Sequence, residues 1–221
     1  MKKAFTLTIA SCFLAIASFA QTSFGVKAGV NSSSWKGDAT QSLNDLMSVT
    51  NGYLSTATHT GFYAGGFAEI PLGNKFSVEP GLYYSQKGYQ VKGELAIDKI
   101  DFLGASATAT LQSHYIDMPV LVKAEVARGL KLYAGPQLSY LVKNNLNLRA
   151  GALGFDVVNT NMDVTNQFKT VDVSLVGGAS YKFDNGLSIE AGYDHGLSRI
   201  DKNSNFKSYN RTFKVGLGFT F

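Results

Sequence analysis

Near the end of the chain lie residue types that hydrolytic enzymes use. His195 is preceded by Asp194 and followed closely by Ser198. Cleavage of an acyl bond would need serine, histidine and carboxylate in mutual hydrogen-bond reach. Neighbouring residues of a strand point to opposite faces, so Asp194 and His195 would point apart. A rim histidine in contact with solvent is therefore the expectation, and no catalytic residue is predicted.

A larger set of charged residues recurs at alternate positions of apolar segments. It holds five basic and five acidic residues: Lys27, Lys123, Lys131, Lys182, Lys214, Glu69, Glu79, Asp117, Asp172 and Glu190. Buried charges need partners, and the equal counts predict ion pairs. No His, Cys or Asp spacing resembles a zinc or calcium site, so neither a metal nor another cofactor is expected.

The segments that carry these charges have a period of two, which is typical of strands. Each is long enough to cross a bilayer at a tilt. Eight are predicted, at residues 23–34, 61–71, 75–86, 113–126, 129–142, 170–183, 187–195 and 209–221.

The two faces of these segments differ in charge. One parity contributes 41 residues, none of them charged, whereas the other carries the ten charges and many glycines. The interior of a soluble eight-stranded barrel is too narrow for so many large apolar side chains. Lipid on the apolar face resolves this conflict, because charges facing hydrocarbon are costly. The prediction is an all-β, eight-stranded, antiparallel, up-and-down transmembrane β-barrel.

The connections alternate between short and long. Short turns are expected at 72–74, 127–128 and 184–186, and long loops near 35–60, 87–112, 143–169 and 196–208. Short periplasmic turns and long extracellular loops are the outer-membrane pattern. An outer aromatic belt is then expected. Its predicted members are Trp35, Phe62, Tyr84, Tyr140, Tyr193 and Phe213.

The first residues predict export. Lys2 and Lys3 precede an apolar stretch that ends in small residues at Ala20, as in a cleaved signal peptide. The expected organisation is a signal peptide at 1–20 and a single barrel domain at 21–221. Cleavage would remove Cys12 and leave 18 basic and 16 acidic residues. This weak charge gives no reason to expect nucleic-acid binding.

Three motifs give the chain a resemblance to a known family. They are Glu79-Pro80-Gly81-Leu82-Tyr83-Tyr84-Ser85-Gln86-Lys87-Gly88, Tyr115-Ile116-Asp117-Met118-Pro119-Val120-Leu121-Val122-Lys123, and Ala134-Gly135-Pro136. The chain resembles the PorT-like outer-membrane β-barrel proteins of Bacteroidota. The resemblance implies the outer membrane of a Gram-negative cell and no particular activity, although one branch is implicated in type IX secretion. Phe219 and Phe221 resemble the end signal that barrel-assembly machinery reads.

Three prolines fall within predicted strands. Pro80, Pro119 and Pro136 each lack the N–H that a ladder needs. Local bulges or bifurcated hydrogen bonds are expected there.

The expected function is non-enzymatic. A lumen plugged by paired charges, with Tyr63, Tyr83, Tyr133 and Gln137 between them, would leave anchoring or surface interaction through the extracellular loops. The alternatives are a lipid-modifying enzyme, a narrow solute channel and an accessory component of a secretion system. Expected partners are outer-membrane lipid, lipopolysaccharide, the assembly machinery and an unknown surface ligand, for a monomer. The third and fourth segments are also expected to extend above the membrane as a hairpin.

Overall fold

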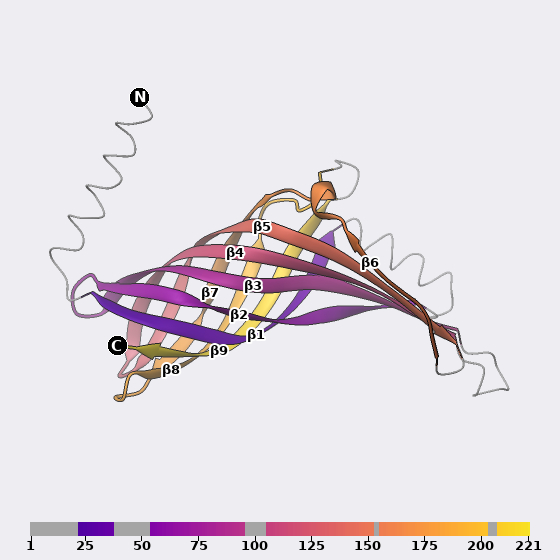
Figure 1. The fold of residues 1–221 in the computed structure, drawn as a ribbon. Coiled ribbons are helices and arrows are strands. Elements are labelled where there is room, and N and C mark those ends of the chain that lie inside the picture. Colours follow the sequence, from indigo (N-terminus) through magenta and orange to yellow (C-terminus); the bar gives the residue numbers. More distant parts are fainter. Residues whose placement is uncertain (1–21, 38–53, 96–104, 153–154, 203–206) are drawn as a thin grey trace, which may run out of the picture.

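The computed structural model describes residues 22–37, 54–95, 105–152, 155–202 and 207–221, which form an antiparallel all-β structure (Figure 1). The strands are β1 Ser23–Gly37, β2 Leu54–Pro71, β3 Phe76–Leu95, β4 Ala105–Ala127, β5 Leu130–Ala152, β6 Phe155–Asp163, β7 Val171–Lys182, β8 Leu187–Gly196 and β9 Ser208–Thr220; a short 3-10 helix, η1, covers Thr165–Gln167.

Eight of the strands close into a ring. Sequence neighbours pair from β1 to β5, β5 pairs with β7, and the order continues through β8 and β9. Strand β9 then pairs with β1 along thirteen positions, from Gly25↔Thr220 to Gly37↔Ser208. A closed ring leaves no unpaired edge in lipid. The predicted eight-stranded antiparallel barrel is confirmed.

The apolar parity faces outward. Leu217 is 56% exposed and Val122 51%, whereas Glu79 is 1% exposed and Lys123 4%. Large apolar side chains cover the outer wall along every strand of the ring. This arrangement gives hydrocarbon an uncharged surface and places the ionic groups inside.

Tight turns join strands at the end of the barrel where the chain terminates (Figure 1). Gly73, Gly129 and Gly186 have φ values of 96°, 78° and 87°. Glycine adopts this left-handed conformation without steric cost, which allows the chain to reverse within a few residues.

At the other end, β3 and β4 extend past the ring and pair with each other, as predicted, and β2 and β5 are longer than predicted. Strands β2 to β5 continue past the ring, and their pairing runs to Leu54↔Gly93, Leu95↔Ala105 and Ala105↔Ala152. The upper part of β5 pairs with β6, so the prediction of a long loop near 143–169 is wrong. The alternation continues beyond the ring, because Leu146 and Leu148 of β5 lie opposite Leu111 and Ala109 of β4 on one face. We name this part, β6 with the upper parts of β2 to β5, the extracellular sheet; it projects from the ring in Figure 1.

The prolines do not create bulges. Pairing keeps one register from Pro80↔Val120 to Tyr83↔Asp117, and from Pro119↔Gln137 to Val122↔Ala134. The register shifts lie elsewhere, for example between His114 and Tyr115. The β3–β4 pairing lacks the two positions between Pro80↔Val120 and Tyr83↔Asp117, and Pro119 lies in this gap. Pro80 and Pro119 therefore lie at the same short break in the hydrogen bonding. The expected bulges are therefore wrong.

Some predictions fall on residues outside the described ranges. They include the signal peptide at 1–20 and the parts of the long loops at 38–53, 96–104, 153–154 and 203–206. Within the described ranges, no helix is long and apolar enough to span a bilayer.

Depth in the membrane should decide the effect of a new charge on the outer wall. Val120 and Val126 lie on the outward face of β4, 47% and 55% exposed, at mid-strand and near the periplasmic turn. Val120→Lys should lower the free energy of unfolding by about 2–4 kcal/mol, and Val126→Lys by about 0–1 kcal/mol. Urea unfolding in lipid vesicles measures both values, and equal losses would contradict the assigned bilayer position.

Candidate functional site

The lumen contains a buried ion cluster centred on Glu79. Lys27 Nζ lies 2.5 Å from Glu79 Oε1, and Lys123 pairs with the second oxygen, Oε2. Lys27 also lies 2.9 Å from Glu190. These residues come from β1, β3, β4 and β8. Glu79 therefore joins β3 to β1 and β4, and Lys27 joins β1 to β8.

Charges nearer the periplasmic end are more accessible to water. Glu69 pairs with Lys131 and accepts a 2.8 Å hydrogen bond from Ser77 Oγ. Lys182 also lies on the inward parity, but it is half-buried and forms no ion pair within the described ranges. Its position near the turn lets a long side chain reach solvent.

A second cluster lies toward the extracellular end. Lys214 Nζ is 2.6 Å from Asp194 and 3.5 Å from Asp117, and Lys87 Nζ is 2.9 Å from Asp117. Gln137 Nε2 donates to Asp194 at 3.2 Å. Lys87 and Asp194 are absent from the predicted set. Lys87 lies one residue beyond the predicted strand, and continued alternation would have placed it inside; Asp194 has the inward parity of its own strand.

Asp172 is held by neutral donors. Its carboxylate accepts hydrogen bonds from Asn210 Nδ2 at 2.7 Å and from Ser198 Oγ at 2.5 Å. No ammonium group pairs with Asp172 among the described residues. The structure thus brings eight of the ten predicted charges into ion pairs, with Asp172 and Lys182 outside them.

Tyrosine rings fill the space between the two clusters. Tyr63 donates to Glu190 at 2.9 Å, and Tyr133 donates to the Ala191 carbonyl at 3.1 Å. Glycines make room for them: a Cβ on Gly216 would lie 2.1 Å from the Tyr63 hydroxyl oxygen. Here the interior holds a cavity of about 40 Å³.

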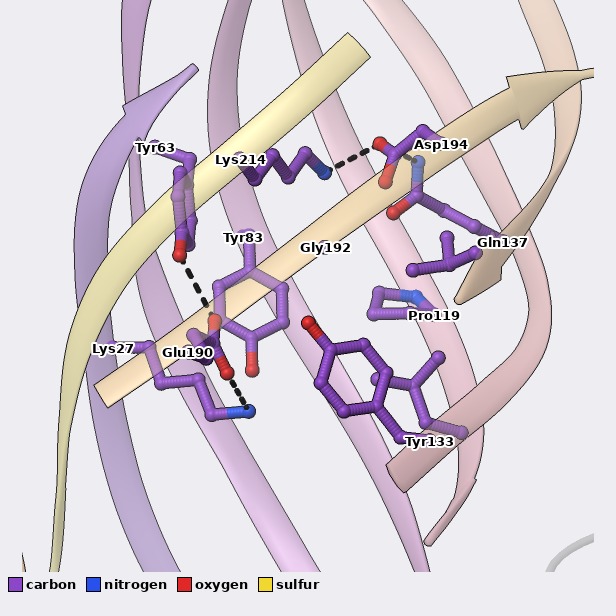
Figure 2. A pocket seen from close by; sticks show the side chains of 12 residues that line it. Lys27, Tyr63, Tyr83, Pro119, Tyr133, Gln137, Glu190, Gly192, Asp194 and Lys214 are labelled. Carbon is purple, nitrogen blue, oxygen red and sulfur yellow. Dashed lines mark hydrogen bonds and ion pairs between the residues drawn. The ribbon is translucent and has the colours of Figure 1, made fainter. Parts of the chain in front are cut away.

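Figure 2 shows the lining of this cavity. Tyr63, Glu190 and Lys27 are linked on one side, and Lys214 and Asp194 on the other. Pro119 and Tyr133 are further lining residues. A cavity of this size accommodates a few water molecules and excludes a larger solute.

The extracellular mouth is covered by side chains from three parts of the chain. The Trp35 ring stacks on Tyr89 with centroids 5.4 Å apart, and Phe168 lies 5.8 Å from Trp35. Lys169 N–H donates to the Ile200 carbonyl at 2.8 Å, which joins the two segments above the ring. Trp35 therefore lies over the lumen, and its predicted place in the lipid-facing belt is wrong.

A carboxylate near this cover is stabilised locally. Asp163 accepts hydrogen bonds from the Thr165 hydroxyl at 2.6 Å and from its backbone N–H at 2.9 Å. These bonds hold the pKa of the Asp163 carboxyl below its usual range. Asp163 and η1 thus form an ordered connection from β6 toward β7.

A family model of the outer membrane protein beta-barrel domain matches residues 19–202. The chain belongs to this family. Solved structures are also similar to this outer-membrane barrel. Ail of Yersinia pestis, in complex with the heparin analogue sucrose octasulfate, has 14% identity and a TM-score of 0.46, with 90% of this chain and 99% of that chain covered.

Two further structures are similar to the outer-membrane barrel. Neisserial surface protein A has 13% identity and a TM-score of 0.43, covering 90% of this chain and 97% of that chain. The N-terminal β-barrel domain of Pseudomonas aeruginosa OprF has 13% identity and a TM-score of 0.37, covering 91% and 100%. No curated protein sequence matches the chain.

The outer-membrane barrel does not bring the hydrolase-like residues together. The exposed His195 ring contacts Tyr193, with centroids 6.2 Å apart. Ser198 Oγ instead donates to Asp172 and accepts from the Val173 N–H. Histidine and serine therefore lack the contact that a triad requires. Within the described ranges, no group of three or more His, Cys, Asp or Glu could hold a metal.

The last residues of the barrel lie on its outer wall. Phe219 and Phe221 pack edge to face, with centroids 5.6 Å apart. Phe221 N–H donates to the Phe24 carbonyl at 2.8 Å, which fixes the end of the chain beside β1. Both rings are exposed on the lipid side.

Removal of the central carboxylate should destabilise the outer-membrane barrel strongly. Glu79→Gln leaves Lys123 without its nearest carboxylate and should cost about 3–5 kcal/mol in urea unfolding. The double variant Glu79→Leu/Lys123→Met, which removes both charges and keeps the Lys27–Glu190 pair, should recover most of this loss.

Lys182→Met provides the control for that experiment, because Lys182 shares the inward parity but forms no described ion pair. Its effect should stay within about 1 kcal/mol. A loss at Lys182 as large as at Glu79 would contradict a stabilising role for the pairs.

Proposed function

We propose that this protein is a non-enzymatic outer-membrane barrel with a plugged lumen, which anchors an extracellular sheet for surface interaction. The carrying observation is that paired charges and tyrosine rings fill the interior and leave a cavity of about 40 Å³. The cover at Trp35 and Phe168 supports the same proposal, because it closes the extracellular mouth.

The extracellular sheet supports the interaction role. Five strands contribute to it, and β6 pairs with β5 in the region beyond the ring. A paired sheet presents a binding surface with less loss of conformational entropy than a free loop would suffer. The unknown surface ligand would therefore contact strands as well as loop tips.

Several finer features belong to the same proposal. Residues 1–20 would be a cleaved signal peptide and 21–221 a single barrel domain that functions as a monomer in contact with lipopolysaccharide. Phe219 and Phe221 would be read by the barrel-assembly machinery. The motifs at 79–88, 115–123 and 134–136 favour a place among PorT-like proteins of Bacteroidota.

The alternatives are less well supported. The contacts of Ser198 with Asp172 disfavour a lipid-modifying enzyme, and the filled interior disfavours a solute channel. A role as an accessory component of a secretion system would use the same barrel, and no described contact favours it.

Conductance tests the plug. The purified barrel in a planar bilayer should show no reproducible current steps, because paired charges and tyrosine rings fill the lumen. A variant with alanine at Lys27, Glu79, Tyr83 and Tyr133 empties the middle of the lumen. If this variant is folded, as judged by heat-dependent gel mobility, it should produce current steps. It is therefore the positive control, which shows that the recording can detect an open lumen. Current steps from the unaltered protein would overturn the plug.

Accessibility in whole cells tests the anchoring role. Residues 21–221 contain no cysteine, so single cysteines can report topology. Lys92→Cys, on the extracellular sheet, should react with a membrane-impermeant maleimide on intact cells. Arg128→Cys, in an exposed tight turn, should react only after the outer membrane is permeabilised. The reverse result would place the sheet in the periplasm and refute the proposal.

A further inference from the structure

A basic patch lies on the outward face of β1, β8 and β9 at the extracellular end. We name it the outer-rim patch, and its members are Ser34, Lys36, His195, Tyr209 and Arg211. Register places them together: Arg211 lies opposite Ser34 on one side and His195 on the other, and Lys36 lies opposite Tyr209. All share the outward parity of their strands, and Lys36 and His195 are exposed.

The outer-rim patch stands directly above the aromatic belt. Tyr193 and Phe213 are register partners two positions below His195 and Arg211, and both rings face lipid. Two residues of a strand span about 7 Å, so the patch begins where the hydrocarbon ends. Its cations therefore lie at the depth of lipid headgroups.

Arg211 is already oriented by the protein. Its Nη1 donates to the Gly196 carbonyl at 2.7 Å and to the Asn210 carbonyl at 3.0 Å. The Tyr209 ring lies 6.0 Å from the guanidinium carbon. Among the described residues, Nε and Nη2 form no hydrogen bond, so two donor groups remain for a ligand. A fixed guanidinium suits phosphate, which accepts two parallel hydrogen bonds.

The nearby carboxylates do not neutralise the patch. Glu190 and Asp194 point into the lumen, where they pair with Lys27 and Lys214. Asp201 accepts a hydrogen bond from the Ser208 N–H on the inward side of β9. The outward face around Arg211 thus keeps an uncompensated positive charge within the described ranges.

The wall below the patch is suited to hydrocarbon. Phe213, Val215 and Leu217 follow one another down the outward face of β9. Further toward the periplasm, the same wall has an open groove of about 600 Å³, lined by apolar side chains that include Val26, Ala28, Leu187 and Leu217. A soluble polyanion would need the cations alone, whereas a lipid uses both the cations and the apolar wall.

We infer that the outer-rim patch binds the phosphate-bearing headgroup of an outer-leaflet lipid, whose acyl chains lie along β1, β8 and β9. Arg211 and Lys36 supply charge, and the Ser34 and Tyr209 hydroxyls supply further donors. The site requires membrane insertion and is independent of whether the lumen conducts.

Native mass spectrometry tests this site, with the barrel in phosphatidylcholine micelles that contain diphosphoryl lipid A. The unaltered protein should retain lipid A in preference to phosphatidylcholine. Lys36→Ala/Arg211→Ala should reduce that enrichment by at least about fivefold, because each basic residue near the surface contributes to anion binding. The control Lys92→Ala/Lys143→Ala also removes two exposed basic residues and should retain the enrichment.

Three outcomes would overturn the inference. Equal enrichment in the unaltered protein and Lys36→Ala/Arg211→Ala would show that the patch binds no lipid headgroup. An equal loss in both double variants would indicate net charge rather than a site. Binding of a soluble heparin oligosaccharide that depends on Arg211, with lipid A retention unchanged, would assign the patch to a polyanion. Unchanged heat-dependent gel mobility confirms that each variant is folded.

Discussion

The bilayer core contains no water, and this constraint governs the whole structure. Backbone N–H and C=O groups have no partner there except one another, so the sheet must close on itself, as it does where β9 meets β1. Charged side chains have no acceptable place on the outer wall, so Glu79, Asp117 and Lys123 are turned inward. A narrow ring then forces these charges together, and pairing follows from confinement. The ion clusters are a consequence of sidedness rather than its cause.

The lumen is filled by charged residues and tyrosines that recur at inward positions of the same strands. Glu79, Tyr83 and Lys87 share the inward parity of β3 and are buried in the lumen. Tyr115, Asp117 and Lys123 share the inward parity of β4. These are residues of the motifs that give the chain its family resemblance, so the resemblance reports how the barrel is filled. Buried ion pairs add less net stability than their number suggests, because desolvation offsets the attraction.

The sequence predicted the membrane-embedded part of the fold well because lipid imposes a strict alternation there. The outward Val120, Leu132 and Leu217 and the inward Glu79 follow from it directly. Prediction weakened where that constraint ends. Beyond the ring, lipid no longer requires one face to be free of charge. Leu146 and Leu148 of β5 still share a face opposite Leu111 and Ala109 of β4, but this alternation was not used to extend the predicted strand. Lys87 was not predicted because the strand was ended at Gln86, where the apolar residues become sparse. Trp35 was misplaced because an aromatic residue at a rim can cover the lumen as well as face lipid. The site geometry, such as Gln137 on Asp194, depends on contacts between distant strands and left no local signal.

Strand β5 has different neighbours at different heights: β7 along its lower half and β6 along its upper half. The closed ring therefore continues into the open extracellular sheet through β2 to β5, each of which is one continuous strand. A pulling force on the extracellular sheet would reach the ring through the four continuous strands β2 to β5. It would therefore be distributed over half of the eight strands of the ring. Each of these strands is continuous from the ring into the extracellular sheet, so the ring orients the sheet relative to the cell surface. The extracellular sheet is therefore a rigid extension of the barrel rather than a domain on a flexible linker.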